Sequence, residues 1–180
     1  MAPLTAAIPV FLAGLMIGRT PEYLGKKIGP RENKMIILYA IAGPLSILTL
    51  TAAAISTQAG LARLTTNDGA HGLTEIVFGF ASCFANNGQS FAGLSANTPF
   101  YNIMTAVAMM VGRFGLAIPA LIFCRSFCTA ERIDRTRGTL RTDSFPFAFL
   151  LTIFLLVATA LSYLPVLTLG PVLEHLLFKP

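Results

Sequence analysis

The chain has 180 residues, of which 12 % are charged and 54 % hydrophobic, and its formal net charge is +5. A soluble domain carries about a quarter of charged residues, so this composition and a mean hydropathy of +0.70 exclude an ordinary soluble domain. The apolar runs are continuous and do not alternate, which predicts an all-α integral membrane protein and not a barrel.

Four apolar segments are expected to form transmembrane helices, over residues 3–18, 35–57, 99–124 and 145–169. The first is marginal in length. Residues 35–57 span about 34 Å as a helix, enough for a hydrocarbon core of about 30 Å. Pro99 suits a helix start, where its missing N–H costs nothing, and the last helix is expected to end near Gly170-Pro171.

The basic residues lie mostly in two connectors, over residues 19–34 and 125–141. Lys and Arg in short loops beside membrane helices mark the cytoplasmic side, so the positive charge gives no argument for a nucleic-acid partner. An even number of crossings must then separate the connectors, and residues 35–57 and 99–124 supply two. The apolar segment 72–85 is therefore expected to enter and leave by the same face, as a re-entrant helix.

The re-entrant helix is followed by a polar, glycine-containing loop over residues 86–93. Backbone carbonyls can replace the water around a cation, and the negative end of a short helix dipole favours a cation there. Glycine and asparagine tolerate the dihedral angles that such a loop needs. We therefore expect residues 72–85 to be a pore helix and Asn87, Gly88, Gln89 and Ser90 to form an ion-selective filter.

An alternative remains open for this segment: an interfacial amphipathic helix over residues 72–85, followed by a surface turn. Such helices favour Lys and Arg on their polar face, and this one has neither. Arg113, near the middle of the third transmembrane segment, also has two interpretations. It is either a fixed positive charge below the filter or a structural arginine bound to helix-end carbonyls, and the adjacent glycines favour a kink or a close helix approach.

The remaining reactive residues give no sign of enzymatic chemistry. Cys83, Cys124 and Cys128 lack zinc-ligand spacing and are expected to be free thiols. His71 and His175 are isolated in the sequence, and no nucleophile–base pair or phosphate-binding loop is visible. No metal other than a transported ion, and no cofactor, is expected.

Three motifs carry a resemblance to a known family: GRTPEYLGKK over residues 18–27, NNGQSFAGLSANTPF over 86–100 and VGRFG over 111–115. With them, the chain resembles the potassium-binding A subunit of the bacterial Kdp potassium-transporting ATPase up to Gly170-Pro171. Only the loop over residues 124–144 differs. The resemblance implies the fold of the superfamily of potassium transporters, in which four helix–pore loop–helix modules surround one filter.

The resemblance covers only the C-terminal part of that subunit. Residues 3–18 would be the inner helix of the preceding module, followed by one complete module and a last helix in a single membrane domain over residues 1–180. Gly88 matches the filter glycine and Arg113 the arginine of the inner helix. The implied location is the bacterial inner membrane, and the implied partners are a P-type ATPase subunit that hydrolyses ATP and small accessory subunits.

Two features depart from the family pattern. The filter strands of the other three modules are absent, so a complete filter requires the N-terminal modules from elsewhere, and Gln89 replaces a smaller residue. The chain also begins without a basic signal-peptide region, as if inside a membrane helix, which suggests a truncated or split gene product. The alternative function is therefore a non-transporting membrane fragment with an assembly role or no role.

Overall fold

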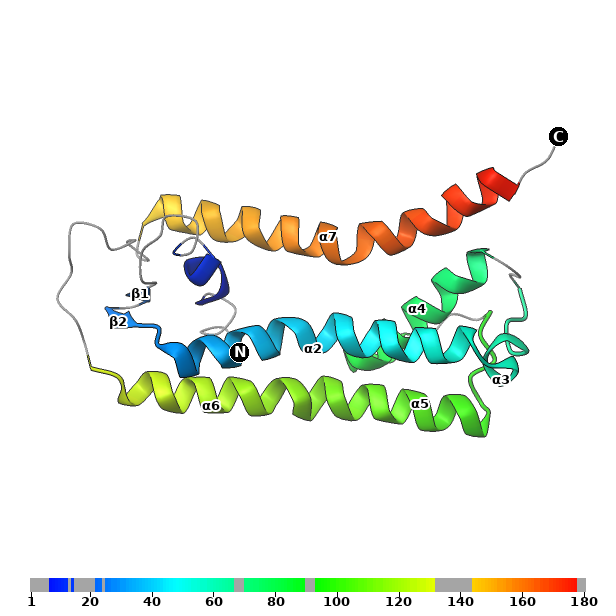
Figure 1. Cartoon of the computed structure of the whole chain (residues 1–180), viewed down its shortest axis with the longest axis horizontal. Coiled ribbons are helices and arrows are strands. Elements are labelled where there is room, and N and C mark those ends of the chain that lie inside the picture. Colours follow the sequence, from blue (N-terminus) through cyan, green and yellow to red (C-terminus); the bar gives the residue numbers. More distant parts are fainter. Residues whose placement is uncertain are drawn as a thin grey trace. The chain divides into compact units, whose positions relative to one another are not determined.

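The computed structural model describes residues 7–12, 14, 22–23, 25–66, 70–89, 93–131 and 144–177. Residues 7–12 are helical, and a two-residue hairpin and a series of helices follow them (Figure 1). These elements are β1 (Glu22–Tyr23), β2 (Lys26–Lys27), α2 (Pro30–Ile55), α3 (Gln58–Leu61), α4 (Ala70–Phe84), α5 (Pro99–Met110), the π-helical η1 (Val111–Gly115), α6 (Leu116–Thr129) and α7 (Phe145–Leu177). The described part of the chain is thus mostly helical, as predicted.

Within the described residues, two helices are long and apolar enough to cross a membrane. They are Pro30–Ile55, with 26 residues, and the continuous run Pro99–Thr129 through α5, η1 and α6, with 31 residues. They cover the predicted segments 35–57 and 99–124, apart from residues 56 and 57. A shorter apolar stretch, Phe145–Leu161, lies in α7. Of the predicted helix over residues 3–18, only residues 7–12 and 14 are described, and all of these are helical.

Helix α2 begins at Pro30, before the apolar run at which the sequence predicted its start. Glu32, the third helical residue, accepts a hydrogen bond from the N–H of Gly29 at 3.0 Å. This is one half of a capping box, and the proline occupies the first helical position, where it is well tolerated. Polar capping therefore extends the helix into the first basic connector, and β1 pairs with β2 there, a hairpin that the sequence did not predict.

Two other helices run further than predicted. Helix α6 continues to Thr129, so the predicted loop 125–141 begins inside a helix. The last turn of α6 is bound by Lys26, whose Nζ donates to the carbonyls of Phe127 and Cys128 at 2.8 and 2.9 Å. A cation at a helix C-terminus stabilises its last carbonyls. Helix α7 continues through Gly170-Pro171 to Leu177, contrary to the predicted end at residue 169. Apolar membrane helices tolerate Gly and Pro better than soluble ones do.

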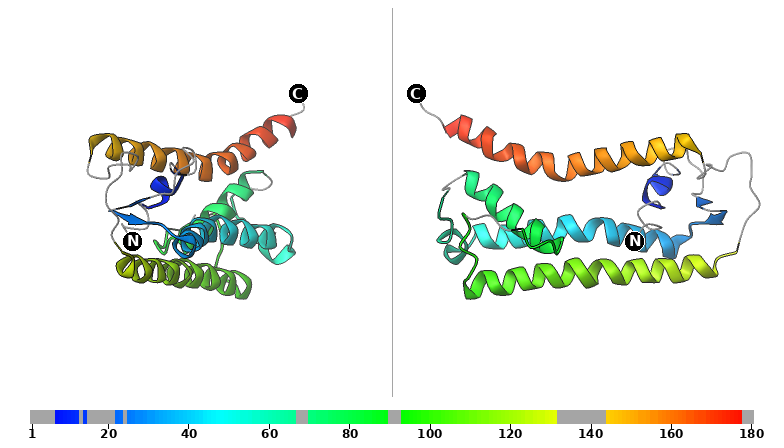
Figure 2. Two further views of the ribbon diagram at one scale, coloured as in Figure 1. Left: turned by 60° about the vertical axis from the view of Figure 1, so that its left-hand side comes forward. Right: turned by 180° about the vertical axis from the view of Figure 1, so that it is seen from behind.

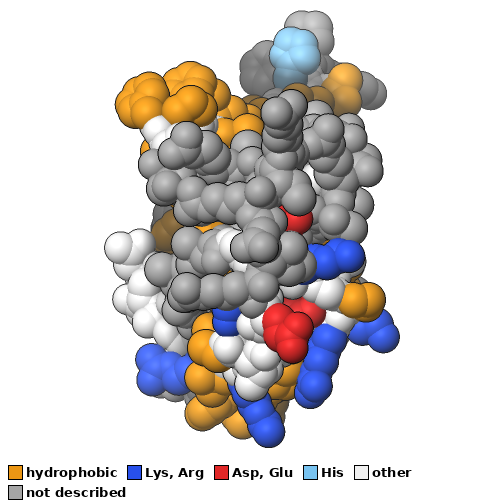
Figure 3. Space-filling view, turned by 90° about the vertical axis from the view of Figure 1, so that its left-hand side faces the viewer, with side chains coloured by type: hydrophobic (Ala, Val, Ile, Leu, Met, Phe, Trp, Pro, Cys, Tyr) orange, Lys and Arg blue, Asp and Glu red, His pale blue; other side chains and the backbone are white. Residues whose placement is uncertain are grey.

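The chain divides into two compact units. The first comprises residues 1–40 and 117–159, and its core contains Val10, Ile36 and Phe123. The ring of Phe123 stacks on that of Phe127 with centroids 5.4 Å apart, and the ring of Tyr23 packs against Phe127 at a tilt, with centroids 5.7 Å apart. Figure 3 looks onto the end that carries β1 and β2, where Lys and Arg side chains gather around acidic ones. The basic connectors are thus partly folded: Ser126 bonds to Glu32, and Lys26 reaches α6.

The second unit comprises residues 41–116 and 160–180, and α4 packs mainly against α5 within it (Figure 2). Its core joins Ile76 and Phe80 of α4 to Tyr101 and Ala108 of α5. The rings of Phe80 and Tyr101 are 6.1 Å apart, and the Tyr101 hydroxyl donates to the carbonyl of Gly60 at 3.0 Å. This packing holds the loop that follows α4 against α5 and η1.

Candidate ion site

Helix α4 has the length that a pore helix needs. It covers Ala70–Phe84, close to the predicted 72–85, and its 15 residues extend about 22 Å. That is shorter than a hydrocarbon core of about 30 Å, so α4 alone cannot cross a membrane. Its apolar face is buried, with Ile76 and Phe80 almost completely covered.

Helix α4 ends in a Schellman motif built around asparagine. Asn86 has a positive φ of 55°, and its N–H donates to the carbonyl of Cys83 at 3.0 Å. The N–H of Asn87 donates to the carbonyl of Ser82 at 3.3 Å. These two hydrogen bonds, together with the left-handed conformation of Asn86, define the motif. The chain therefore turns sharply out of the helix at Asn86.

The loop that follows is held by its own side chains. The Ser82 hydroxyl donates to Asn87 Oδ1 at 2.6 Å, and the same oxygen accepts the backbone N–H of Gln89 at 3.1 Å. Gly88 has a φ of +72°, which favours glycine, and no atom lies within 4 Å of the position that a Cβ would take there. Hydrogen bonds thus fix this part of the backbone, while residues 87–89 remain exposed at the surface.

Three of the four predicted filter residues are described. Asn87, Gly88 and Gln89 are consecutive and exposed, whereas Ser90 lies outside the described residues, as do residues 91 and 92 of the predicted loop 86–93. Asn87 contributes its side chain to the loop's internal bonding, so its backbone and not its amide is the group available to an ion. The assignment of these residues to an ion site remains a prediction.

The returning part of the loop is fixed by a segment that sequence reasoning missed, residues 63–66. The N–H and hydroxyl of Thr65 both donate to the carbonyl of Gly93 at 2.8 Å. The N–H of Ser95 donates to the carbonyl of Arg63 at 3.0 Å, and Leu64 forms an antiparallel bridge with Leu94. Residues 63–65, before α4, and residues 93–95, after the loop, therefore pair as two short antiparallel segments.

A buried carboxyl group, that of Glu75, lies next to these two paired segments. Glu75 of α4 is 6 % exposed, and its Oε1 accepts the Thr66 hydroxyl at 3.0 Å. A Cβ on Gly93 would lie 2.7 and 2.8 Å from the two carboxylate oxygens, so Gly93 is the residue that allows this approach. The signal in the sequence was the single acidic residue of an otherwise uncharged helix, but its partners cannot be read from the sequence.

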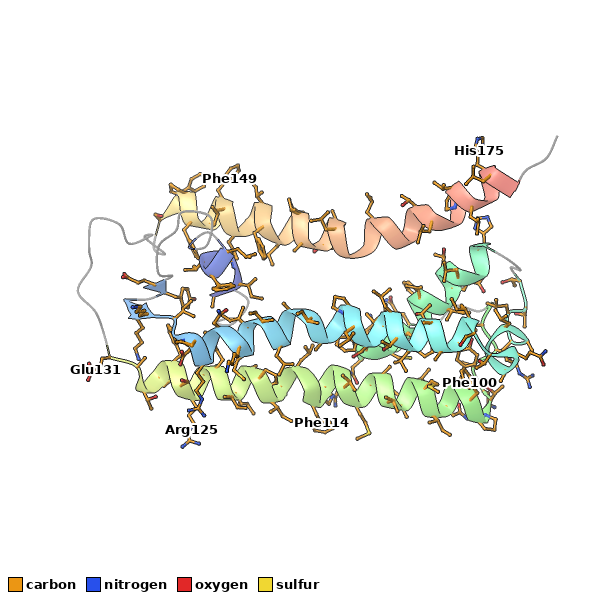
Figure 4. The ribbon with its side chains drawn as sticks, in the orientation of Figure 1. Phe100, Phe114, Arg125, Glu131, Phe149 and His175 are labelled. Atoms are coloured by element: carbon orange, nitrogen blue, oxygen red, sulfur yellow. The ribbon has the colours of Figure 1, made fainter. Side chains whose placement is uncertain are left out.

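Arg113 lies in the middle of η1, and its side chain is exposed. The adjacent Gly112 is buried against the carbonyl of Phe84, which a Cβ at that position would overlap. The expected close helix approach is therefore confirmed at Gly112. Within the described residues, no hydrogen bond or ion pair of the Arg113 side chain is found, and this side chain does not bind the carbonyls at the end of α4. Its neighbour Phe114 points outward from the helix (Figure 4).

Two apolar helices of membrane-spanning length flank a short helix that ends in a polar loop, an arrangement typical of helical membrane proteins. The chain belongs to the family of the potassium-transporting ATPase A subunit, KdpA, whose model matches residues 3–176. The resemblance noted in the sequence is thereby confirmed.

Individual relatives agree with the family match. The chain is 51 % identical over 173 residues to the potassium-transporting ATPase potassium-binding subunit of Laribacter hongkongensis, covering 96 % of this chain and 30 % of that protein. It is 48 % identical over 171 residues to the subunit of the same name from Geobacter sulfurreducens, covering 95 % of this chain and 29 % of that protein. The chain thus spans less than a third of the length of these relatives.

Proposed function

We propose that this chain binds potassium and takes part in its translocation, as part of the channel-like subunit of an ATP-driven potassium uptake complex. The observation that supports this best is the loop after α4, where the chain turns out of the helix at Asn86, Gly88 has a positive φ, and the consecutive residues 87–89 are exposed. The names of the relatives, which are potassium-binding subunits, give the ion.

The mechanism we propose is dehydration of the ion and its coordination by backbone oxygens of Asn87, Gly88, Gln89 and Ser90. Carbonyl dipoles replace water without covalent chemistry. The dipole of α4 places partial negative charge at its C-terminal end, and that end lies beside the loop. Arg113 supplies a fixed positive charge in η1, which we propose limits how many cations occupy the path.

The proposed complex contains partners that do the remaining work. The chain itself is non-catalytic, and ATP is hydrolysed by a P-type ATPase subunit that acts with small accessory subunits. Because a filter needs several loops around one axis, the other helix–pore loop–helix modules come from further polypeptide of the same subunit. The proposed location is the bacterial inner membrane, with the basic connectors in the cytoplasm.

Substitution of Gly88 tests the proposed site. Gly88→Asp and Gly88→Arg place a side chain in the loop and force an L-residue into a left-handed conformation, which costs about 1–2 kcal/mol. Such a cost corresponds to a factor of about ten in an equilibrium constant, so we expect the half-saturating potassium concentration of the potassium-stimulated ATPase to rise about tenfold or more.

Gly25→Ala is the matched control, because Gly25 in the β1–β2 turn has the same φ of +72°. It should leave potassium affinity unchanged even if it lowers stability. Gly88→Ala separates the two parts of the effect, since the loop has room for a Cβ and only the conformational cost remains. Unchanged affinity in Gly88→Asp would remove the loop from the ion path.

In the second candidate function, the chain is a membrane fragment that does not transport potassium and has either a role in assembly or no role. What favours it is the coverage of less than a third of the relatives' length. Affinity purification of this chain from its native membrane separates the candidates. Recovery of an ATPase subunit and of the other modules supports transport, whereas recovery of the chain alone supports the fragment.

A further inference from the structure

Asn86 makes two contacts that the ion-binding function does not require. Its amide nitrogen Nδ2 donates to the carbonyl of Phe84 at 3.0 Å and to the carbonyl of Met109 at 3.3 Å. The first acceptor belongs to the last residue of α4. The second lies in the last turn of α5, directly before η1. One side chain thus connects the start of the loop to the neighbouring helix.

A close backbone approach between α4 and η1 lies at the same place. Gly112, the second residue of η1, lies against the carbonyl of Phe84 so tightly that a Cβ would overlap it. That Cβ position is also only 3.1 Å from Asn86 Nδ2. The end of α4, the amide of Asn86 and η1 therefore meet without space for an intervening side chain or water.

The element on the other side of this contact is a π-helical segment. Such segments interrupt the regular i→i−4 bonding of a helix and occur often at functional sites. Here the segment Val111–Gly115 carries Arg113 and begins two residues after the carbonyl that Asn86 binds. A change in its hydrogen bonding moves the acceptor of Asn86, and Asn86 is the residue whose positive φ sets the course of the loop.

We infer that Asn86 is a positioning residue that couples the pore loop to η1, so that the hydrogen bonding of η1 and the occupancy of the ion site depend on each other. This inference rests on the proposed potassium site. By thermodynamic linkage, if the hydrogen bonding of η1 changes the affinity of the loop for potassium, bound potassium must change the stability of η1. Potassium in the loop should therefore stabilise η1, although no residue of η1 belongs to the proposed filter.

Hydrogen exchange measured by mass spectrometry tests this coupling in the full chain, purified with the proteins that accompany it. Asn86→Gly removes the amide but keeps the left-handed conformation accessible, and Asn86→Asp keeps the shape but removes the donor. We expect the peptide covering residues 109–116 to exchange about fivefold faster in both variants, as loss of one hydrogen bond implies. Added potassium should slow that peptide in the parent and not in the variants.

Asn102→Ala is the control, because Asn102 is an exposed asparagine of α5. It should leave the exchange of residues 109–116 and the effect of potassium as in the parent. Exchange of that peptide in Asn86→Gly at the parent rate would overturn the coupling. If instead potassium slows no peptide of the parent, the proposed ion site is wrong, and exchange without potassium still decides whether Asn86 holds η1.

Discussion

Single glycine and asparagine residues determine how the backbone runs in and around the loop that follows α4. Gly88 and Asn86 have positive φ values, and Gly112 and Gly93 allow backbone or carboxylate groups to approach where a Cβ would be in the way. Two of these residues set the direction of the chain, and the other two allow a close contact with another element. Substitutions at the four positions should therefore have different effects. The geometry of the loop thus depends on residues of the loop itself and on Gly112 of η1.

Gly112→Ala should destabilise the protein through a clash of backbone with backbone. The new Cβ would overlap the carbonyl of Phe84, so α4 and η1 must separate, at a cost of about 1–3 kcal/mol. In a protein of this size each kcal/mol lowers the midpoint of thermal unfolding by about 2–4 °C. The measurement is thermal unfolding of the purified full chain in detergent.

Gly115→Ala is the control in the same π-helical segment. The nearest atom to its Cβ would be Cγ1 of Val111 at 3.1 Å, a side-chain atom that can move by a few tenths of an ångström. It should therefore change the midpoint much less than Gly112→Ala does. Equal midpoints for the two variants would mean that the close approach at Gly112 carries no energy.

For single residues, the sequence predicted which positions could adopt a left-handed backbone, but not which residues would form hydrogen bonds with each other. The left-handed residues of the loop follow from the presence of Asn and Gly after an apolar helix, because few other residues accept a positive φ. The contacts of Asn86 with Met109 and of Glu75 with Thr66 join residues that are 23 and 9 positions apart. Such contacts depend on the packing of α4 against its neighbours, which no local pattern specifies.

At the scale of the element, the start of α5 is the clearest case of local sequence control. Thr98 is the N-cap, with φ −136° and ψ 154°, and its side chain accepts the N–H of Tyr101 at 3.3 Å. Pro99 follows at the first helical position. The helix therefore begins at the residue that the sequence predicted, because both signals act within one turn.

Thr98→Ala should reduce stability by about 1 kcal/mol, the usual cost of losing an N-cap side chain. Thr105→Ala is the matched control, since in the described part of the chain the Thr105 hydroxyl donates only to carbonyls of its own helix, those of Tyr101 and Asn102. Chemical or thermal unfolding of both variants in detergent gives the comparison. A Thr98→Ala protein as stable as Thr105→Ala would show that α5 needs no cap.

The ends that the sequence placed wrongly depend on distant or opposing signals. Helix α6 extends to Thr129 where Lys26, 101 residues earlier than Phe127, binds its last carbonyls. Helix α7 continues past Pro171 although a proline removes one hydrogen bond and crowds the preceding turn, because membrane helices tolerate such interruptions better than soluble ones do. A glycine–proline pair therefore ends a helix less reliably in such a chain than in a soluble protein.

At the scale of the whole molecule, the surface is that of a protein surrounded by lipid or further protein. Large apolar side chains remain exposed along the helices, among them Leu121 at 69 % and Phe114 at 57 %. A water-soluble monomer does not expose apolar area on this scale. The chain covers 30 % or less of the length of the two relatives named above.

In the proposed topology, α4 and its loop enter the membrane and return by the same face. It requires both basic connectors to lie on one side, with residues 58–69 on the other. Cysteine labelling with a membrane-impermeant maleimide tests this in intact cells and in inverted vesicles. In a chain with Cys83 and Cys124 replaced by Ala, the exposed Cys128 reports on one connector. With Cys128 also replaced, Lys27→Cys reports on the other connector and Arg63→Cys on the opposite side.

Residues 27 and 128 should be labelled in inverted vesicles and protected in intact cells, and residue 63 should show the reverse. Labelling of residues 27 and 128 from opposite sides of the membrane would mean that α4 does not return by the face it entered, and a pore loop at residues 86–93 would then be impossible.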